Sequence, residues 1–186
     1  MNFLIRSLRA SARLLCIASA AAVSVGVLAP PAAAAPGDEP TCLRGPNPNV
    51  YYKITNVGTG KSLNVARKSR ASGAPIIQWA YAGGTNEQWR AVCAANWQYK
   101  LVARHSGLVL DLAASSTVQR PYTGVPSQKW GLSRVGQEGA LATFNLYNQG
   151  TSTVIEAAAD GSAVESAVAE EGDRQQLWTF EETGAV

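Results

Sequence analysis

The sequence contains little of the residue types that metal sites and nucleophilic active sites use. It has one histidine and three cysteines in 186 residues, and so few potential ligands, with no Cys/His cluster, do not provide a zinc site. Ser106 follows the single histidine, His105, but neighbours on a strand point to opposite faces and are poorly placed to act as nucleophile and base. We therefore expect a loop role for His105, no catalytic site and no cofactor.

The chain also lacks a long hydrophobic run outside its N-terminus. There, an apolar stretch of Ala, Leu and Val follows three basic residues, Arg6, Arg9 and Arg13. This pattern predicts a secretory signal peptide over residues 1–34, with cleavage after Ala34 or one residue to either side. A retained membrane anchor is the alternative, although the run from Leu14 to Leu28 is short for a bilayer span.

Excess charge is absent once this leader is removed. Residues 1–34 hold three of the 16 basic residues and none of the 13 acidic ones, so the mature net charge is 13 − 13 = 0. A neutral chain gains little from releasing counterions at nucleic acid and is not drawn to anionic lipid. We expect a secreted, extracellular monomer that binds neither nucleic acid nor membrane.

Only two cysteines, Cys42 and Cys93, remain in the mature chain, because Cys16 falls in the leader. Two thiols in an oxidising compartment usually pair, which would tie an irregular Pro- and Gly-rich arm over residues 35–49 to the domain that follows. Two buried free thiols are the alternative.

From residue 50 onward the sequence repeats itself three times. Each copy closes on a Trp with Glu or Gln two positions earlier, as in Asn86-Glu87-Gln88-Trp89, Ser127-Gln128-Lys129-Trp130 and Gln175-Gln176-Leu177-Trp178. Upstream, a polar residue inside a small apolar strand recurs at intervals of 47 and 45 residues, as Asn64, Asp111 and Glu156. Such a period indicates one supersecondary unit used three times, over residues 50–93, 97–134 and 142–182 of one domain, 50–182.

Short aliphatic and aromatic runs separated by turn residues indicate an all-β fold within each repeat. Four short strands in each of three units predict a closed barrel capped by hairpins. An aromatic at the same register of every repeat fills a shared interior, so Trp89, Trp130 and Trp178 are expected in the core, with Gln128 and Gln176 satisfying loop backbone groups. The Ala-rich stretch 157–169 is expected to form strand and loop rather than helix.

Repeats that end in Gln-x-Trp, with Gly-Lys-Ser-Leu-Asn-Val at 60–65 and Gly-Leu-Val-Leu-Asp-Leu at 107–112 upstream, resemble the ricin-type β-trefoil lectins. The resemblance covers residues 50–182. It implies a β-trefoil in which each repeat can hold one shallow sugar site. That site is built from the Asp of the upstream segment, an aromatic about ten residues before the closing Trp, and the Asn and Gln just before that Trp.

The resemblance places sugar-binding residues in the first two repeats. In the first, Trp79 is the aromatic and Asn86 the amide, whereas Asn64 replaces the Asp and Glu87 replaces the Gln. We hypothesise that Glu87 supplies the missing charge.

The second repeat keeps Asp111 and Gln128, but Arg120 stands in the aromatic position; Tyr122 could substitute if the loop is shifted by two residues. The third repeat has Glu156, Val168 and Gln175 in the three positions, so no sugar is expected there.

The sequence leaves three functions to compare. The leading hypothesis is a secreted carbohydrate-binding protein with one or two shallow sites and a glycan or polysaccharide as partner. The second is a trefoil scaffold with decayed sugar sites that binds or inhibits a protein, for which the acidic loop around Glu170 and Glu171 is a candidate surface. The third, hydrolysis by a carboxylate pair such as Glu87 and Asp111, has no support from spacing.

Overall fold

The computed structural model describes residues 42, 45–160 and 162–186, so the predicted signal peptide, residues 1–34, and residues 35–41 of the arm lie outside it. The described residues form 12 strands: β1 (Val50–Asn56), β2 (Ser62–Val65), β3 (Ile76–Trp79), β4 (Gln88–Ala95), β5 (Gln98–Ala103), β6 (Val109–Ala113), β7 (Ser116–Arg120), β8 (Trp130–Glu138), β9 (Leu141–Asn148), β10 (Val154–Ala157), β11 (Val164–Ala167) and β12 (Trp178–Ala185). Four 3₁₀ turns lie between them: η1 (Ala66–Lys68), η2 (Thr85–Glu87), η3 (Pro126–Gln128) and η4 (Arg174–Gln176). The all-β fold class is confirmed. Within the described ranges, no helix has the length and apolar character that a membrane span needs.

Six of the strands close into a barrel. β1 pairs with β4, β4 with β5, β5 with β8, β8 with β9, β9 with β12, and β12 returns to β1, all antiparallel. Each repeat contributes its first and last strand, so no repeat can form the barrel alone. The final strand continues to Ala185, three residues beyond the predicted domain boundary at 182, because Val50 at the start of β1 still pairs with it there.

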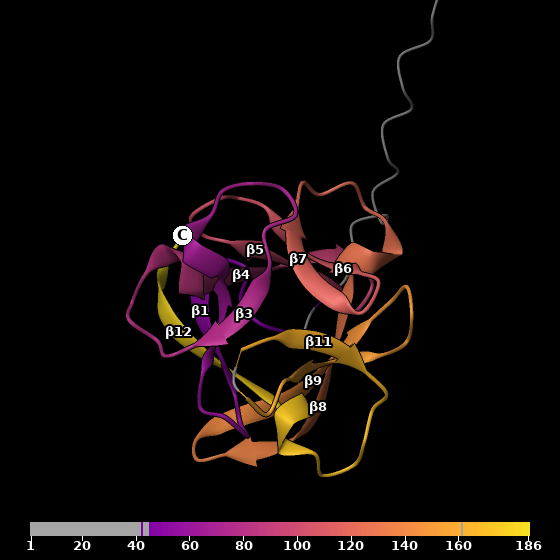
Figure 1. The fold of residues 1–186 in the computed structure, drawn as a ribbon. Helices are drawn as coiled ribbons and strands as arrows, with labels where there is room; N and C mark the ends of the chain where they lie inside the picture. The colour runs from indigo at the N-terminus through magenta and orange to yellow at the C-terminus, as the bar shows by residue number, and fades with distance from the viewer. Residues whose placement is uncertain (1–41, 43–44, 161) are drawn as a thin grey trace, which may run out of the picture. The chain divides into compact units, whose positions relative to one another are not determined.

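The remaining six strands form three hairpins, β2–β3, β6–β7 and β10–β11, that cap one end of the barrel. Neighbouring hairpins are joined by single bridges: Pro75 with Val118, Ser116 with Glu165, and Ile77 with Ala163. Figure 1 shows β3, β7 and β11 arranged around the middle of the view, one from each repeat. This is the β-trefoil arrangement that the sequence predicts.

The closing tryptophans of the three repeats fill the interior. Trp89, Trp130 and Trp178 are each fully buried, and each indole Nε1 donates to a main-chain carbonyl of its own repeat's cap strand, at 2.9, 3.1 and 3.2 Å. A buried indole needs such an acceptor. The predicted core role of these residues is confirmed, and so is strand and loop over the Ala-rich stretch, where β11 lies.

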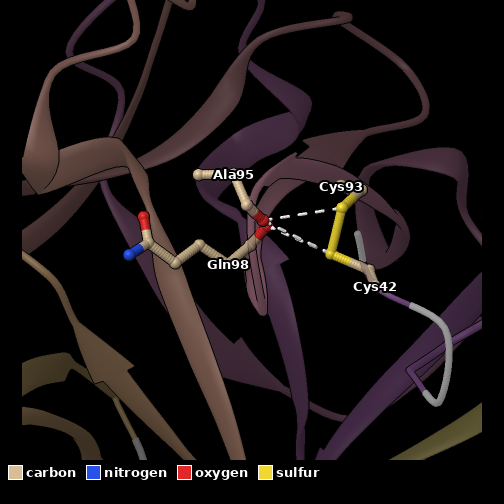
Figure 2. Close-up of a disulfide and its surroundings, with 4 residues drawn as sticks. All are labelled: Cys42, Cys93, Ala95 and Gln98. Carbon is tan, nitrogen blue, oxygen red and sulfur yellow. Dashed lines mark hydrogen bonds between the residues drawn. A yellow bond between two sulfur atoms is a disulfide. The ribbon is translucent and has the colours of Figure 1, made fainter. Parts of the chain in front are cut away.

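A disulfide joins Cys42 to Cys93, with 5.9 Å between the Cα atoms. Figure 2 shows the bridge beside the hairpin between β4 and β5, where the carbonyl oxygens of Ala95 and Gln98 contact the Cys42 sulfur at 3.5 and 3.6 Å. The bridge fastens the arm to the barrel, so the predicted pairing is confirmed and the free-thiol alternative is wrong.

Candidate functional site

Asn64, Asn86 and Glu87 form one hydrogen-bonded group on the first repeat. Asn64 lies in β2, and the other two lie in η2, the turn that precedes β4. The Asn86 Nδ2 donates to Asn64 Oδ1 at 2.8 Å, and Asn64 Nδ2 donates to Glu87 Oε1 at 3.0 Å. Each of the three side chains is only 4% exposed. Three of the predicted sugar-binding residues are thus brought together.

The second carboxylate oxygen of Glu87 holds the loop in front of η2. It accepts hydrogen bonds from the backbone N–H groups of Ala82 at 2.8 Å and Gly84 at 3.2 Å. The loop approaches so closely at Gly84 that a Cβ there would lie 2.6 Å from Asn86 Oδ1. The side chains of Asn64, Asn86 and Glu87 form the floor of the site. Glu87 therefore fixes both this floor and the loop beside it.

The corresponding pairs in the other two repeats carry the same groups in exchanged positions. Gln128 Nε2 donates to Asp111 Oδ2 at 3.1 Å, and Gln176 Nε2 donates to Glu156 Oε2 at 2.8 Å. There the carboxylate is on the strand and the amide is on the turn. In the first repeat the amide is on the strand and the carboxylate on the turn, so one negative charge and one complementary hydrogen bond are kept in every repeat.

Trp79 lies beside this floor and lines the same hollow. It is the last residue of β3 and its side chain is 59% exposed. It borders a hollow of about 510 Å³, whose other lining residues are Asn64, Arg67, Lys68, Ile77, Ala82, Asn86 and Glu87. An exposed indole beside buried amides offers an apolar face and polar groups to the same ligand.

In the second repeat an arginine takes the place of this tryptophan. Trp79 pairs with Ser62 in the first cap hairpin, and Arg120 pairs with Val109 at the same register of the second. One guanidinium nitrogen of Arg120 lies 3.6 Å from Asp111 Oδ2. The predicted carboxylate is thus buried, at 2% exposure, and already engaged by protein groups.

Gln128 uses all of its hydrogen-bonding positions within the protein. Its Nε2 donates to Asp111 and to the Pro121 carbonyl at 2.9 Å, while its Oε1 accepts from the N–H and the hydroxyl of Thr123 at 2.7 and 3.2 Å. The side chain is 1% exposed. The expected role of this glutamine in satisfying loop backbone groups is confirmed.

Tyr122 corresponds to Tyr81 of the first repeat. The ammonium of Lys100 lies 4.4 Å from the Tyr122 ring centre, and that of Lys53 lies 5.2 Å from the Tyr81 ring centre. The two lysines are 47 residues apart, which is the repeat interval. Tyr122 is 37% exposed, but one face of its ring is covered by a cation, and the two-residue shift that would put it in the aromatic position is wrong.

The third repeat has alanine in the aromatic position. Ala167 pairs with Val154 as Trp79 pairs with Ser62. Counting ten residues back from Trp178 predicted Val168 for this position, which is wrong by one residue. The loop before η4 is one residue longer: Gln176 Oε1 accepts from Glu170, six residues earlier, whereas Gln128 accepts from a residue five earlier.

Four residues that line the hollow are missing from the sequence prediction: Ile77, Ala82 and two basic residues, Arg67 and Lys68. The two basic residues bear on the chemistry of the site. They follow Asn64 by three and four positions and form the end of η1. Both have left-handed backbone angles, with φ of 56° and 54°. A comparison of the residues after each cap strand would have shown them, because the other two repeats carry no basic residue there.

The single histidine bonds to main chain. His105 is 8% exposed and its Nε2 lies 2.7 Å from the carbonyl oxygen of Ser69, while the Ser106 hydroxyl donates to Gln119 at 2.8 Å. The two residues therefore bond to different groups and do not form a nucleophile–base pair. Among the described residues, no cluster of three or more His, Cys, Asp or Glu side chains could hold a metal ion.

The family model of ricin-type β-trefoil lectin-like domains matches residues 42–125. Among solved structures, a designed three-fold symmetric protein, ThreeFoil, is 31% identical, with a TM-score of 0.66 over 72% of this chain and 99% of that one. A ricin B-like lectin of Macrolepiota procera, solved with lactose, is 22% identical, with a TM-score of 0.59 over 75% of this chain and 99% of that one. An exo-β-1,3-galactanase of Clostridium thermocellum is 23% identical, with a TM-score of 0.65 over 72% of this chain and 30% of that one.

No curated protein matches the sequence. The family match, the similarity to the designed three-fold symmetric protein over 99% of its length and the closed barrel with its three hairpins agree. The chain belongs to the family of ricin-type β-trefoil lectin-like domains.

Proposed function

We propose that this protein is a secreted carbohydrate-binding protein that binds sugar through its first repeat. The observation that carries the proposal is the exposed Trp79 beside the buried group of Asn64, Asn86 and Glu87. The ricin B-like lectin solved with lactose supports a sugar ligand for this fold.

The chemistry of the hollow suits a pyranose ring. The Trp79 indole covers the apolar C–H face of the sugar. In the described part of the chain, Asn86 Oδ1 is buried without a hydrogen-bond partner, so it can accept from a sugar hydroxyl once the adjoining loop at Gly84 moves aside. Glu87 keeps the amides of Asn64 and Asn86 in position, and the negative charge that it holds strengthens the network.

The second repeat contributes a weaker site in this proposal. Asp111 Oδ1 has no partner among the residues that the structure describes, and it can accept from a sugar hydroxyl once Arg120 turns outward; that side chain is 47% exposed. Gln128 positions Asp111 rather than touching sugar. Tyr122 contributes an edge of its ring, because Lys100 covers one face.

The test is retention of the mature protein on a polysaccharide and glycan panel, comparing wild type with Trp79→Ala and Trp97→Ala. Trp97 is a matched control, since it is 56% exposed but is no lining residue of the hollow. Truncating an aromatic anchor at the centre of a site costs about 2 kcal/mol or more, which is roughly a 30-fold loss of affinity. We expect that loss in Trp79→Ala and wild-type affinity in Trp97→Ala.

Other outcomes would change the assignment. Equal losses in both tryptophan variants would show non-specific aromatic adsorption and contradict the proposal. Loss in Asp111→Ala, with Trp79→Ala unaffected, would move the principal site to the second repeat. No retention of wild type on any glycan would reject carbohydrate binding.

Secretion is proposed from two features. The N-terminal 34 residues have the sequence pattern of a signal peptide, and the disulfide between Cys42 and Cys93 is typical of an oxidising compartment. N-terminal sequencing of the protein from the culture medium of an expressing cell tests secretion and the cleavage position, with mature residue Ala35 expected first.

A scaffold that binds protein is the second candidate. Two of the three aromatic positions hold Arg120 and Ala167, and a hollow beside the third repeat includes three acidic side chains in its lining, Glu138, Glu170 and Glu171, of which Glu138 pairs with Arg174. Binding of a protein partner that survives Trp79→Ala and is lost on Glu170→Gln with Glu171→Gln would support this candidate over the first.

A further inference from the structure

The rim of the first-repeat hollow carries two exposed cations, Arg67 and Lys68. Within the described ranges neither of them forms an ion pair. Their charges are therefore available to a ligand that also contacts Trp79.

The cations occur only where the exposed aromatic occurs. Three and four positions after the polar strand residue, the second repeat has Ala114 and Ser115, and the third has Ala159 and Asp160. The connections differ in length: residues 66–75 join β2 to β3, whereas residues 114–115 join β6 to β7. Arg67 and Lys68 have left-handed φ values of 56° and 54°. Left-handed angles are costly for residues other than Gly, Asn and Asp, so the backbone of this turn does not favour long basic side chains.

The turn that carries the cations is held from the second repeat. The carbonyl oxygen of Ser69 lies 2.7 Å from His105 Nε2 and accepts from Gln119 Nε2 at 2.8 Å. Gln119 Nε2 also donates to the Ala71 carbonyl at 2.9 Å. Because these contacts fix the backbone directly after Lys68, the two charges project from a pre-organised turn, which lowers the cost of ordering them on binding.

The surface continues past Arg67. A second hollow of about 510 Å³ is lined by the segment from Ser69 to Pro75, and Arg67 and Ile77 line both hollows. A ligand longer than one sugar can thus extend from Trp79 past the guanidinium.

We propose that the first-repeat site selects anionic glycans, with a carboxylate or sulfate group of the oligosaccharide bound between Arg67 and Lys68 while a neighbouring sugar ring stacks on Trp79. A guanidinium binds either anion through paired N–H donors. The buried charge of Glu87 repels an anion, but three N–H donors, from Asn64, Ala82 and Gly84, already bind the Glu87 carboxylate. The inference rests on the carbohydrate-binding function proposed above.

The experiment measures affinities of the mature protein for three acidic oligosaccharides: oligogalacturonate, hyaluronan fragments and chondroitin sulfate fragments. Oligogalacturonate and hyaluronan fragments are compared with their methyl esters, and chondroitin sulfate fragments with a desulfated and methyl-esterified form, so that each counterpart has the same sugar rings without the charge. The variant is Arg67→Asn with Lys68→Asn, because Asn accepts left-handed backbone angles. Arg134→Asn, an exposed residue in β8, is the charge control.

We expect wild type to bind at least one acidic member about 3- to 10-fold more tightly than its neutral counterpart, the effect of one or two exposed ion pairs. The preference should disappear in the double variant, persist in Arg134→Asn, and weaken in 1 M salt. If only the sulfated pair, or only the carboxylated pairs, show this difference in affinity, that result identifies the anion.

Two results would overturn the inference. Equal affinity for every acidic member and its neutral counterpart, with all binding lost in Trp79→Ala, would leave a lectin for neutral sugars. Charge preference that is retained in the double variant would place the anion elsewhere. No binding to either series would reject the carbohydrate-binding function itself.

Discussion

The exchange of carboxylate and amide between Asn64 and Glu87 predicts a strong energetic coupling between these two residues. In Glu87→Gln, one end of the new amide must face either the Asn64 amide, which donates to it, or the N–H groups of Ala82 and Gly84. If the new NH2 group faces Ala82 and Gly84, donor meets donor in every case. If it faces Asn64, the conflict is avoided only when Asn64 and Asn86 turn over, and turning Asn86 loses its bond to the Val65 carbonyl at 3.3 Å. A bond to a charged group is worth about 1.5–3 kcal/mol and an unsatisfied buried donor costs about 1–3 kcal/mol. We expect Glu87→Gln to destabilise the fold by roughly 2–3 kcal/mol.

The other single variant, Asn64→Asp, creates a different conflict. It brings a second carboxylate to the place where the Asn64 amide now lies 3.0 Å from a Glu87 oxygen. At an effective dielectric constant of about 20, two unit charges at that distance repel by roughly 5 kcal/mol, and uptake of one proton relieves part of this. We expect a loss of roughly 2–4 kcal/mol at pH 7 that becomes smaller toward pH 5.

The double variant, Asn64→Asp with Glu87→Gln, reproduces the Asp111–Gln128 pair of the second repeat. The measurement is a urea-denaturation cycle of the wild type, the two single variants and the double variant, with tryptophan fluorescence as the signal. We expect the double variant to be within about 1 kcal/mol of wild type, which gives a coupling of roughly 3 kcal/mol or more, beyond the range of independent sites. Additivity within about 0.5 kcal/mol would refute the reasoning, because the two side chains would then not depend on each other.

The remaining predictions concern the disulfide, the buried tyrosines and the second repeat. Replacing both Cys42 and Cys93 by Ser should lower the free energy of unfolding by about 2–4 kcal/mol, since the bridge spans 51 residues and the loop-entropy model gives about 4 kcal/mol at that separation; chemical denaturation checks it, and an unchanged midpoint would contradict it. Burial raises the pKa of Tyr52 and of Tyr99, so the folded state holds the phenol protons more tightly than the unfolded chain. That stability is complete below about pH 10, the ordinary tyrosine pKa, and is lost as the pH rises through the folded values; the urea midpoint should fall in this range for wild type and fall less for Tyr99→Phe. Arg120→Trp should restore the aromatic position beside Asp111 and tighten the weaker glycan site of the second repeat, so that calorimetry detects two sites instead of the stronger one alone; a stoichiometry that stays at one would count against the register assignment.

Much of the fold could be predicted from the sequence because the repeat places the same residue type at the same structural position three times. Trp89, Trp130 and Trp178 are interior and bond to the equivalent carbonyl in each repeat. The pairing of Cys42 with Cys93 followed from the number of thiols. In both cases few arrangements were compatible with the residues present.

The site could be predicted only where the spacing within a repeat is constant. Counting back from Trp178 gave Val168 instead of Ala167, because the loop before η4 is one residue longer. The same counting works for Trp79 and Arg120, where the loops have equal length. Strand register, which the sequence does not show, decides which residue lies beside the floor.

Arg67 and Lys68 could not be assigned to the site from the family pattern, since that pattern has no position between the strand residue Asn64 and the aromatic Trp79. Their position depends on a turn that is held by His105 and Gln119 from the next repeat. The contact between repeats, absent from any single repeat, brings these charges to the hollow. It also gives the only histidine a structural role.

The exchanged pair and the rim cations are consistent with a single change in ligand chemistry. Among the described site residues, the buried acceptor without a partner is a carboxylate oxygen in the second repeat, Asp111 Oδ1, and an amide oxygen in the first, Asn86 Oδ1. A free carboxylate oxygen repels an anionic sugar, whereas an amide oxygen does not. Moving the charge to Glu87, where protein N–H groups bind both of its oxygens, leaves a neutral acceptor at the floor. Among the described residues, this neutral floor occurs in the repeat that has Arg67 and Lys68 at its rim, so both features favour the same anionic ligand.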